Sequence, residues 1–132
     1  MRNAIACLRG EGIRGVVRFC PCPMGVRITA EIYGLPDGFH GFHIHEGADC
    51  GGTGFADTGG HYGAGPHPDH AGDLPPLLSC NGRAVLSLET GRFRLCDVLG
   101  RTVVIHSGPD DFRSQPAGAS GEKIACGKII SC

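Results

Sequence analysis

Six histidines and one aspartate have the residue types and the spacing of metal ligands. His43 and His45 are separated by one residue in a segment expected to be a strand. Side chains at positions i and i+2 share one face of a strand, so both imidazoles can approach one ion. The remaining candidates are His61, His67, His70, Asp73 and His106. Imidazole suits copper and zinc, so the pattern predicts a metal site, and the number of ligands allows two.

An alternative interpretation is a set of unrelated histidines that cap loops or satisfy hydrogen bonds in the core. The spacing favours metal binding instead. His67, His70 and Asp73 lie three residues apart in a loop, and His43 and His45 share a strand face. Unrelated histidines have no reason to follow two such patterns in one chain.

The segments that must position these residues are short and rich in β-branched side chains. Val26, Ile28, Ala30 and Ile32 alternate with polar residues, which is the period of a half-buried strand. Eight strands are expected over 4–8, 15–19, 26–32, 39–45, 83–88, 92–96, 102–106 and 123–130. With no helix expected, the pattern predicts an all-β protein, an eight-stranded antiparallel Greek-key sandwich or barrel of immunoglobulin-like architecture.

The composition supports a protein with many turns. The 132 residues include 23 Gly, 9 Pro and 8 Cys, and Gly and Pro both disfavour helix interiors. Hydrophobic residues make up 41 % and the net charge is −1, which excludes a disordered chain. We expect a single domain over residues 1–132. Two turn-rich segments, 46–80 and 107–122, are long enough to be functional loops.

Several classes of protein are excluded. There is no apolar run of about 18 residues, so no transmembrane helix is expected. Basic residues are scattered and the pI is near 6.6, which argues against binding of nucleic acid. The first residues do not form a signal peptide. We therefore expect a cytoplasmic location, with an exported or cell-surface location as the alternative.

Five motifs make the chain recognisable. They are Gly41-Phe-His-Ile-His-Glu46, Gly59-Gly-His-Tyr62, His70-Ala-Gly-Asp-Leu-Pro75, Gly100-Arg-Thr-Val-Val-Ile-His106 and Ile124-Ala-Cys-Gly127. In this order they resemble the copper/zinc superoxide dismutase family, especially its bacterial forms. The resemblance extends over residues 4–130. It implies the same sandwich architecture that the strand pattern predicts.

The resemblance implies a role for each position that matches a family motif. The implied copper ligands are His43, His45, His61 and His106, and the implied zinc ligands are His61, His67, His70 and Asp73, with His61 bridging the two ions. Asp110 matches an aspartate that ties a copper histidine to a zinc histidine. Cys50 and Cys126 match a structural disulfide. Lys123 stands where the family usually has an arginine beside the copper, and it keeps the positive charge without the planar fork of arginine.

The activity implied by the resemblance is conversion of superoxide to oxygen and hydrogen peroxide by copper that alternates between Cu(II) and Cu(I). Superoxide is then the partner, and the chain could be a monomer or a homodimer. The alternative is a related copper- and zinc-binding protein that stores, buffers or senses metal with little turnover. That alternative is motivated by three features of the sequence: Lys123, the short loops and the additional cysteines.

The resemblance leaves six cysteines unexplained: Cys7, Cys20, Cys22, Cys80, Cys96 and Cys132. They could belong to a secreted disulfide framework, or they could be reduced thiols of a cytosolic protein. In the segment Cys20-Pro-Cys22-Pro-Met24, two thiols and a thioether are soft ligands suited to Cu(I). That segment is either a copper-acquisition site or a hairpin tip with incidental cysteines.

Overall fold

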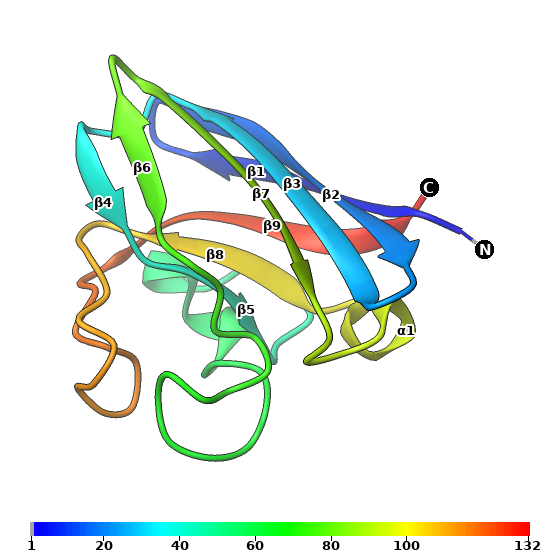
Figure 1. The fold of residues 1–132 in the computed structure, drawn as a ribbon. Coiled ribbons are helices and arrows are strands. Elements are labelled where there is room, and N and C mark those ends of the chain that lie inside the picture. The colour runs from blue at the N-terminus through cyan, green and yellow to red at the C-terminus, as the bar shows by residue number, and fades with distance from the viewer. Residues whose placement is uncertain (1) are drawn as a thin grey trace.

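Nine antiparallel strands form one sheet within residues 2–132, the residues described by the computed structural model (Figure 1). The strands are β1 (Ala4–Gly10), β2 (Ile13–Cys22), β3 (Gly25–Tyr33), β4 (Gly38–His40), β5 (Phe42–His45), β6 (Leu77–Cys80), β7 (Arg83–Thr90), β8 (Thr102–His106) and β9 (Lys123–Ser131). Their order is β4-β6-β7-β3-β2-β1-β9-β8-β5. The expected all-β antiparallel fold is confirmed, with one strand more than the eight predicted.

The sheet nearly closes into a barrel at Gly41. β4 and β5 lie at opposite ends of the strand order although only Gly41 separates them in the chain. The Gly41 N–H donates to Gly108 O, and Gly41 O accepts from the His106 N–H. A Cβ at this position would lie 2.5 Å from Ser120 Oγ, so only glycine fits. The expected single strand over 39–45 is therefore two strands that pair with different partners.

Apolar side chains from alternating positions fill the barrel. Val26, Ile28 and Ile32 are fully buried, in agreement with the alternation along β3. β5 and β8 differ from the other strands because all of their residues are buried. Phe42 and Ile44 belong to the barrel core, whereas His43 and His45, which alternate with them, are buried on the other face of β5. These two strands thus carry histidines into a buried layer outside the barrel.

The strand expected over 92–96 is wrong. A turn and the short helix α1 (Leu95–Val98) occupy this segment. Phe93 and Leu95 alternate with polar residues as in a strand. However, the Arg94 N–H donates to Asp97 Oδ2 at 3.0 Å, and the Arg92 N–H donates to Thr90 Oγ1 at 3.1 Å. These local hydrogen bonds between side chain and backbone close the chain into a turn and a helical start.

The segment 46–80 also contains regular structure that the sequence did not predict. It includes the 3-10 helix η1 (Thr53–Thr58) and the strand β6, which pairs with both β4 and β7. The rest of this segment and the loop 107–122 extend from the same end of the barrel (Figure 1). No helix among residues 2–132 is long and apolar enough to cross a membrane.

Candidate metal centre

Two clusters of potential ligands meet at one histidine. The four-histidine cluster consists of His43, His45, His61 and His106. The His–Asp cluster consists of His61, His67, His70 and Asp73. Within each cluster the ligand atoms lie within 4.8 Å of one another. The structure therefore brings together every histidine and the aspartate singled out from the sequence as ligands, from two strands and one loop.

Backbone carbonyls fix the tautomers of two members of the four-histidine cluster. His45 Nδ1 lies 2.7 Å from Gly59 O, and His106 Nδ1 lies 3.2 Å from Gly121 O. A carbonyl oxygen only accepts a hydrogen bond, so each Nδ1 carries the proton and each Nε2 presents a lone pair. The two Nε2 atoms face each other at 3.4 Å. Two lone pairs at this distance form no hydrogen bond, but they can share a cation.

Carboxylates orient the other two histidines of this cluster in the same way. His43 Nε2 donates to Asp110 Oδ2 at 2.8 Å, and His61 Nδ1 donates to Asp73 Oδ1 at 2.6 Å. The opposite nitrogens, His43 Nδ1 and His61 Nε2, are buried without a hydrogen-bond partner. A buried polar atom without a partner costs about 1–3 kcal/mol. A metal ion would remove that cost from both nitrogens.

The His–Asp cluster shows the same pattern in the loop. His67 Nδ1 and His70 Nδ1 lie 3.2 Å and 3.0 Å from Asp73 Oδ2, yet both nitrogens lack a hydrogen bond because the geometry is unsuitable. Ligands about 2 Å from a tetrahedral ion are themselves about 3.3 Å apart. The donor atoms are therefore arranged around a common point. Three imidazoles and a carboxylate are a donor set that zinc accepts.

Asp110 connects the two clusters. Its Oδ2 accepts from His43 Nε2, and its Oδ1 accepts from His67 Nε2 at 2.7 Å and from the Phe112 N–H at 2.7 Å. Burial alone would raise the pKa of Asp110, but the hydrogen bonds from His43 and His67 outweigh burial and lower it. A carboxylate in this position fixes which ring nitrogens remain bare toward the metals.

The residues present therefore fit a copper site and a zinc site. Every bare nitrogen points into its own cluster, and the side chain of His61 belongs to both clusters. Burial alone would raise the pKa of Asp73, but the hydrogen bond from His61 and the electrostatic influence of the surrounding histidines lower it, so the carboxylate is ionised. A carboxylate and several imidazole nitrogens suit two cations held close together.

Burial keeps three imidazoles of the four-histidine cluster neutral, those of His43, His45 and His106. It lowers the pKa of His43 to about 3, of His45 to about 2 and of His106 to about 4, and repulsion between neighbouring imidazoles adds to the shift. Metal ligands must be deprotonated. At neutral pH these three rings are in the form that binds metal.

The metal-free protein should lose stability as the pH falls below about 6.5. The three histidines have a lower pKa in the folded chain than their ordinary 6.5, so the unfolded chain binds more protons in this range. Each one contributes at most about 1.4 kcal/mol per pH unit. Urea unfolding of the metal-free chain at pH 7, 6 and 5 measures the slope. His106→Gln should reduce the slope by about one proton, and a flat profile would contradict the buried neutral histidines.

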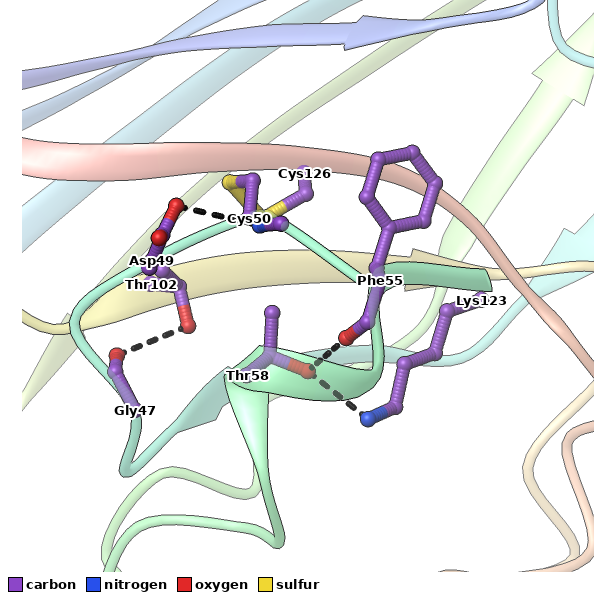
Figure 2. Close-up of a disulfide and its surroundings, with 9 residues drawn as sticks. Gly47, Asp49, Cys50, Phe55, Thr58, Thr102, Lys123 and Cys126 are labelled. Atoms are coloured by element: carbon purple, nitrogen blue, oxygen red, sulfur yellow. Dashed lines mark hydrogen bonds between the residues drawn. A yellow bond between two sulfur atoms is a disulfide. The ribbon is translucent and has the colours of Figure 1, made fainter. Parts of the chain in front are cut away.

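Lys123 lies beside the four-histidine cluster, next to the disulfide. Its Nζ donates to Thr58 Oγ1 at 2.7 Å and to Gly59 O at 3.0 Å, and Gly59 O also accepts from His45 Nδ1. Figure 2 shows the hydrogen bond between Lys123 and Thr58 together with the bond between Cys50 and Cys126. The disulfide expected from the family motif is confirmed. It ties the loop that carries Thr58 to β9, the strand that carries Lys123.

Two side chains that position the His–Asp cluster were not found from the sequence. Gln115 makes a pair of hydrogen bonds with the backbone of His67, accepting from its N–H at 2.8 Å and donating to its carbonyl at 2.7 Å. Arg92 Nη1 donates to three carbonyls of the same loop, those of Pro68, His70 and Asp73. Both side chains bond backbone atoms of a segment that is distant in the sequence. Backbone atoms are the same for every residue type, so no sequence motif marks these contacts.

Comparison with known proteins supports these assignments. Residues 13–129 match the family model described as copper/zinc superoxide dismutase (SODC). A superoxide dismutase [Cu-Zn] of Legionella pneumophila is 40 % identical, over 87 % of this chain and 76 % of its own. The human copper chaperone for superoxide dismutase is 36 % identical, over 96 % of this chain and 52 % of its own.

Two solved structures extend the comparison to the fold. The structure of the clock protein EA4 matches with a TM-score of 0.88 and 33 % identity, over 99 % of this chain and 95 % of its own. The Cu/Zn superoxide dismutase from Brucella abortus matches with a TM-score of 0.84 and 26 % identity, over 96 % of this chain and 99 % of its own. Sequence and structure thus point to the same set of relatives.

Proposed function

The chain belongs to the copper/zinc superoxide dismutase family, and from that premise we propose that it converts superoxide into oxygen and hydrogen peroxide. In this proposal the four-histidine cluster holds copper and the His–Asp cluster holds zinc. Bound copper would supply the one-electron chemistry: one superoxide gives up an electron and leaves as oxygen, and a second takes that electron with two protons and leaves as hydrogen peroxide.

The position of His61 is the observation that carries this proposal. Its Nδ1 faces Asp73 at 2.6 Å, and its Nε2 is buried among the other histidines without a partner. The ring of His61 lies 4.0 Å from that of His43 and 5.2 Å from that of His67, measured between centroids. In this proposal the imidazole of His61 would offer one nitrogen to each ion, because Nδ1 faces the His–Asp cluster and Nε2 faces the other histidines.

The remaining residues hold the ligands and attract the anion. Asp110 keeps the rings of His43 and His67 oriented through their Nε2 protons. The Lys123 ammonium shares the Gly59 carbonyl with His45, which places a positive charge beside the cluster. A positive charge next to the reaction site raises the local concentration of an anionic substrate. Superoxide is such a substrate.

Metal analysis combined with an activity assay tests the proposal. After loading, the two histidine-containing clusters should hold copper and zinc in equal molar amounts, and removal of that copper should abolish dismutation of superoxide while zinc remains bound. A fully loaded protein that does not accelerate the disappearance of superoxide would overturn the proposal. The assay should be run with the same amount of copper and zinc without protein as the background, because free copper also reacts with superoxide.

A second candidate function is binding of copper and zinc with little turnover, as in a storage, buffering or sensing protein. The similarity to a copper chaperone over 96 % of this chain supports it, as does lysine at position 123 in place of the usual arginine. Full metal loading without activity would favour this candidate over the dismutase. Copper-dependent turnover would exclude it.

Loss of the charge of Lys123 should slow the reaction at low ionic strength. Lys123→Gln should lower the second-order rate constant by about tenfold, the lower end of the range for electrostatic steering, and added salt should shrink the difference. Lys123→Arg should equal or exceed the wild-type rate, because the charge is kept and a planar donor fork is gained. Stopped-flow assays at two ionic strengths measure both effects.

Lys128→Gln provides the matched control, since it removes the same charge from an exposed position farther along β9. Its rate should stay within about twofold of wild type. Equal rates for wild type and Lys123→Gln at low salt, with unchanged metal content, would show that Lys123 does not guide the substrate.

A further inference from the structure

The β2–β3 hairpin and α1 both contribute soft sulfur side chains to the lining of one cavity outside the metal centre. The cavity has a volume of about 690 Å³. Cys22 and Met24 line it from the hairpin, and Cys96 lines it from α1. The sequence placed Cys96 in an unrelated segment, so this convergence is a result of the fold.

Packing of α1 against the hairpin explains why these residues converge. The turn that follows β7 runs beneath the hairpin tip, where a Cβ at Gly91 would lie 3.1 Å from Met24 O and 3.6 Å from Met24 Cγ. Phe93 is buried just beyond this turn and anchors the segment to the core. α1 begins two residues later and brings Cys96 to the rim of the cavity.

The chemistry of the lining selects among metal ions. The residues that line the cavity within the described chain include two thiols and a thioether but no imidazole, and the Asp97 carboxylate lies 3.9 Å from Cys96 Sγ. Thiolate and thioether ligands favour soft ions such as Cu(I), and they also bind zinc. Cys22 and Cys96 are both free thiols, and Met24 is 62 % exposed, so all three sulfurs can reach an ion from solvent.

The charges around the cavity favour a monovalent ion. Arg2 and Arg94 also line it. Two thiolates and Cu(I) together carry one negative charge, which a neighbouring arginine offsets. Asp97, next to Cys96, offsets the other arginine. A divalent ion with the same thiolates would be neutral and would leave one arginine uncompensated. The surroundings thus suit a Cu(I)–dithiolate better than a zinc site.

We propose that Cys22 and Cys96 bind Cu(I) as thiolates, with the Met24 thioether as the third donor. This site is separate from the histidine clusters and does not depend on the proposed dismutase activity. Cys96 is exposed on α1, so its side chain is free to turn toward an ion held by Cys22 and Met24. Cys20 lies two residues before Cys22 on β2 and is left outside the ligand set.

Anaerobic titration with Cu(I) tests the site in protein whose histidine centre is already loaded with copper and zinc. A chromophoric Cu(I) chelator should compete for one further class of bound copper. X-ray absorption at the copper edge should show sulfur neighbours in that fraction. Copper bound only through nitrogen or oxygen, or no additional copper at all, would overturn the proposal.

Single substitutions test the assigned ligands. Cys22→Ser and Cys96→Ser should each weaken retention of the additional Cu(I) at least tenfold, while Cys80→Ser, an exposed thiol on β6, should leave it unchanged. Met24→Leu keeps the hairpin side chain apolar and should weaken retention less than either serine variant. If Cys20→Ser abolishes retention and Cys96→Ser does not, the ligands lie on β2 and the cavity assignment is wrong. Circular dichroism and the content of the loaded histidine centre verify that each variant is folded.

Discussion

His106→Ala should lose copper and copper-dependent dismutase activity while keeping zinc and the fold. His106 ends β8 and contributes a bare Nε2 to the four-histidine cluster but no atom to the His–Asp cluster. Changes to residues that merely orient ligands cost 10–100-fold in affinity or activity. Loss of a ligand itself should therefore lower activity by about two orders of magnitude or more.

The fold should survive because the neighbours of His106 carry the packing. Ile105 and Val103 lie in the hydrophobic core, whereas His106 faces the layer of histidines outside the barrel. We expect a change in unfolding free energy within about 2 kcal/mol for the metal-free chain at pH 7. Elemental analysis, the activity assay and urea unfolding together separate loss of copper from loss of structure.

His70→Ala supplies the opposite result as a control. His70 belongs to the His–Asp cluster alone, so this variant should lose zinc and keep copper. If His106→Ala retains activity, the copper assignment is wrong. If His106→Ala loses zinc and keeps copper, the two metals have been assigned to the wrong clusters.

Part of the candidate site could be predicted from the sequence because its geometry is encoded locally. The period of a strand puts His43 and His45 on one face, and the structure places both in the same cluster. The alternation along 26–32 likewise predicted a strand with one buried face, as found in β3. Where the two-residue period of a strand determines which side chains share a face, the sequence alone predicts that arrangement.

Contacts between two irregular segments could not be predicted in this way. Gln115 in one loop makes two hydrogen bonds with the backbone of His67 in another loop, and Arg92 donates to three carbonyls of the loop that carries His67. No periodicity links these positions. The error at 92–96 has a related cause, since Asp97 and Thr90 satisfy backbone N–H groups that a strand would have offered to a neighbour. Hydrogen bonds between side chain and backbone decided the structure there, and apolar alternation did not.

Gly118 makes another contact between loops that no sequence pattern predicts, and its substitution should have a large effect on stability and metal binding. Its φ is +79°, in the left-handed region. A Cβ at this position would lie 2.1 Å from Asp110 Oδ1 and 2.5 Å from His67 Nε2, at the hydrogen bond that links the two clusters. The Asp110 side chain is only 1 % exposed and is held by three hydrogen bonds, so it has little room to move.

Gly118→Ala should therefore destabilise the protein by about 3–5 kcal/mol and weaken metal binding 10–100-fold. The left-handed conformation accounts for about 1 kcal/mol of the lost stability. The rest comes from displacing Asp110 from hydrogen bonds that involve a charge, each worth about 1.5–3 kcal/mol. Metal affinity falls because His43 and His67 lose the carboxylate that orients them. Urea unfolding and competition with a chelator measure the two effects separately.

Gly100→Ala isolates the conformational part of this effect. Gly100 has a φ of +83° and nothing within 4 Å of an added Cβ, so alanine there should cost only about 1 kcal/mol and leave metal binding unchanged. The difference between the two variants is then the contribution of Asp110 and its histidines. If Gly118→Ala costs no more than Gly100→Ala, Asp110 can move without loss, and the two clusters do not depend on the carboxylate that joins them.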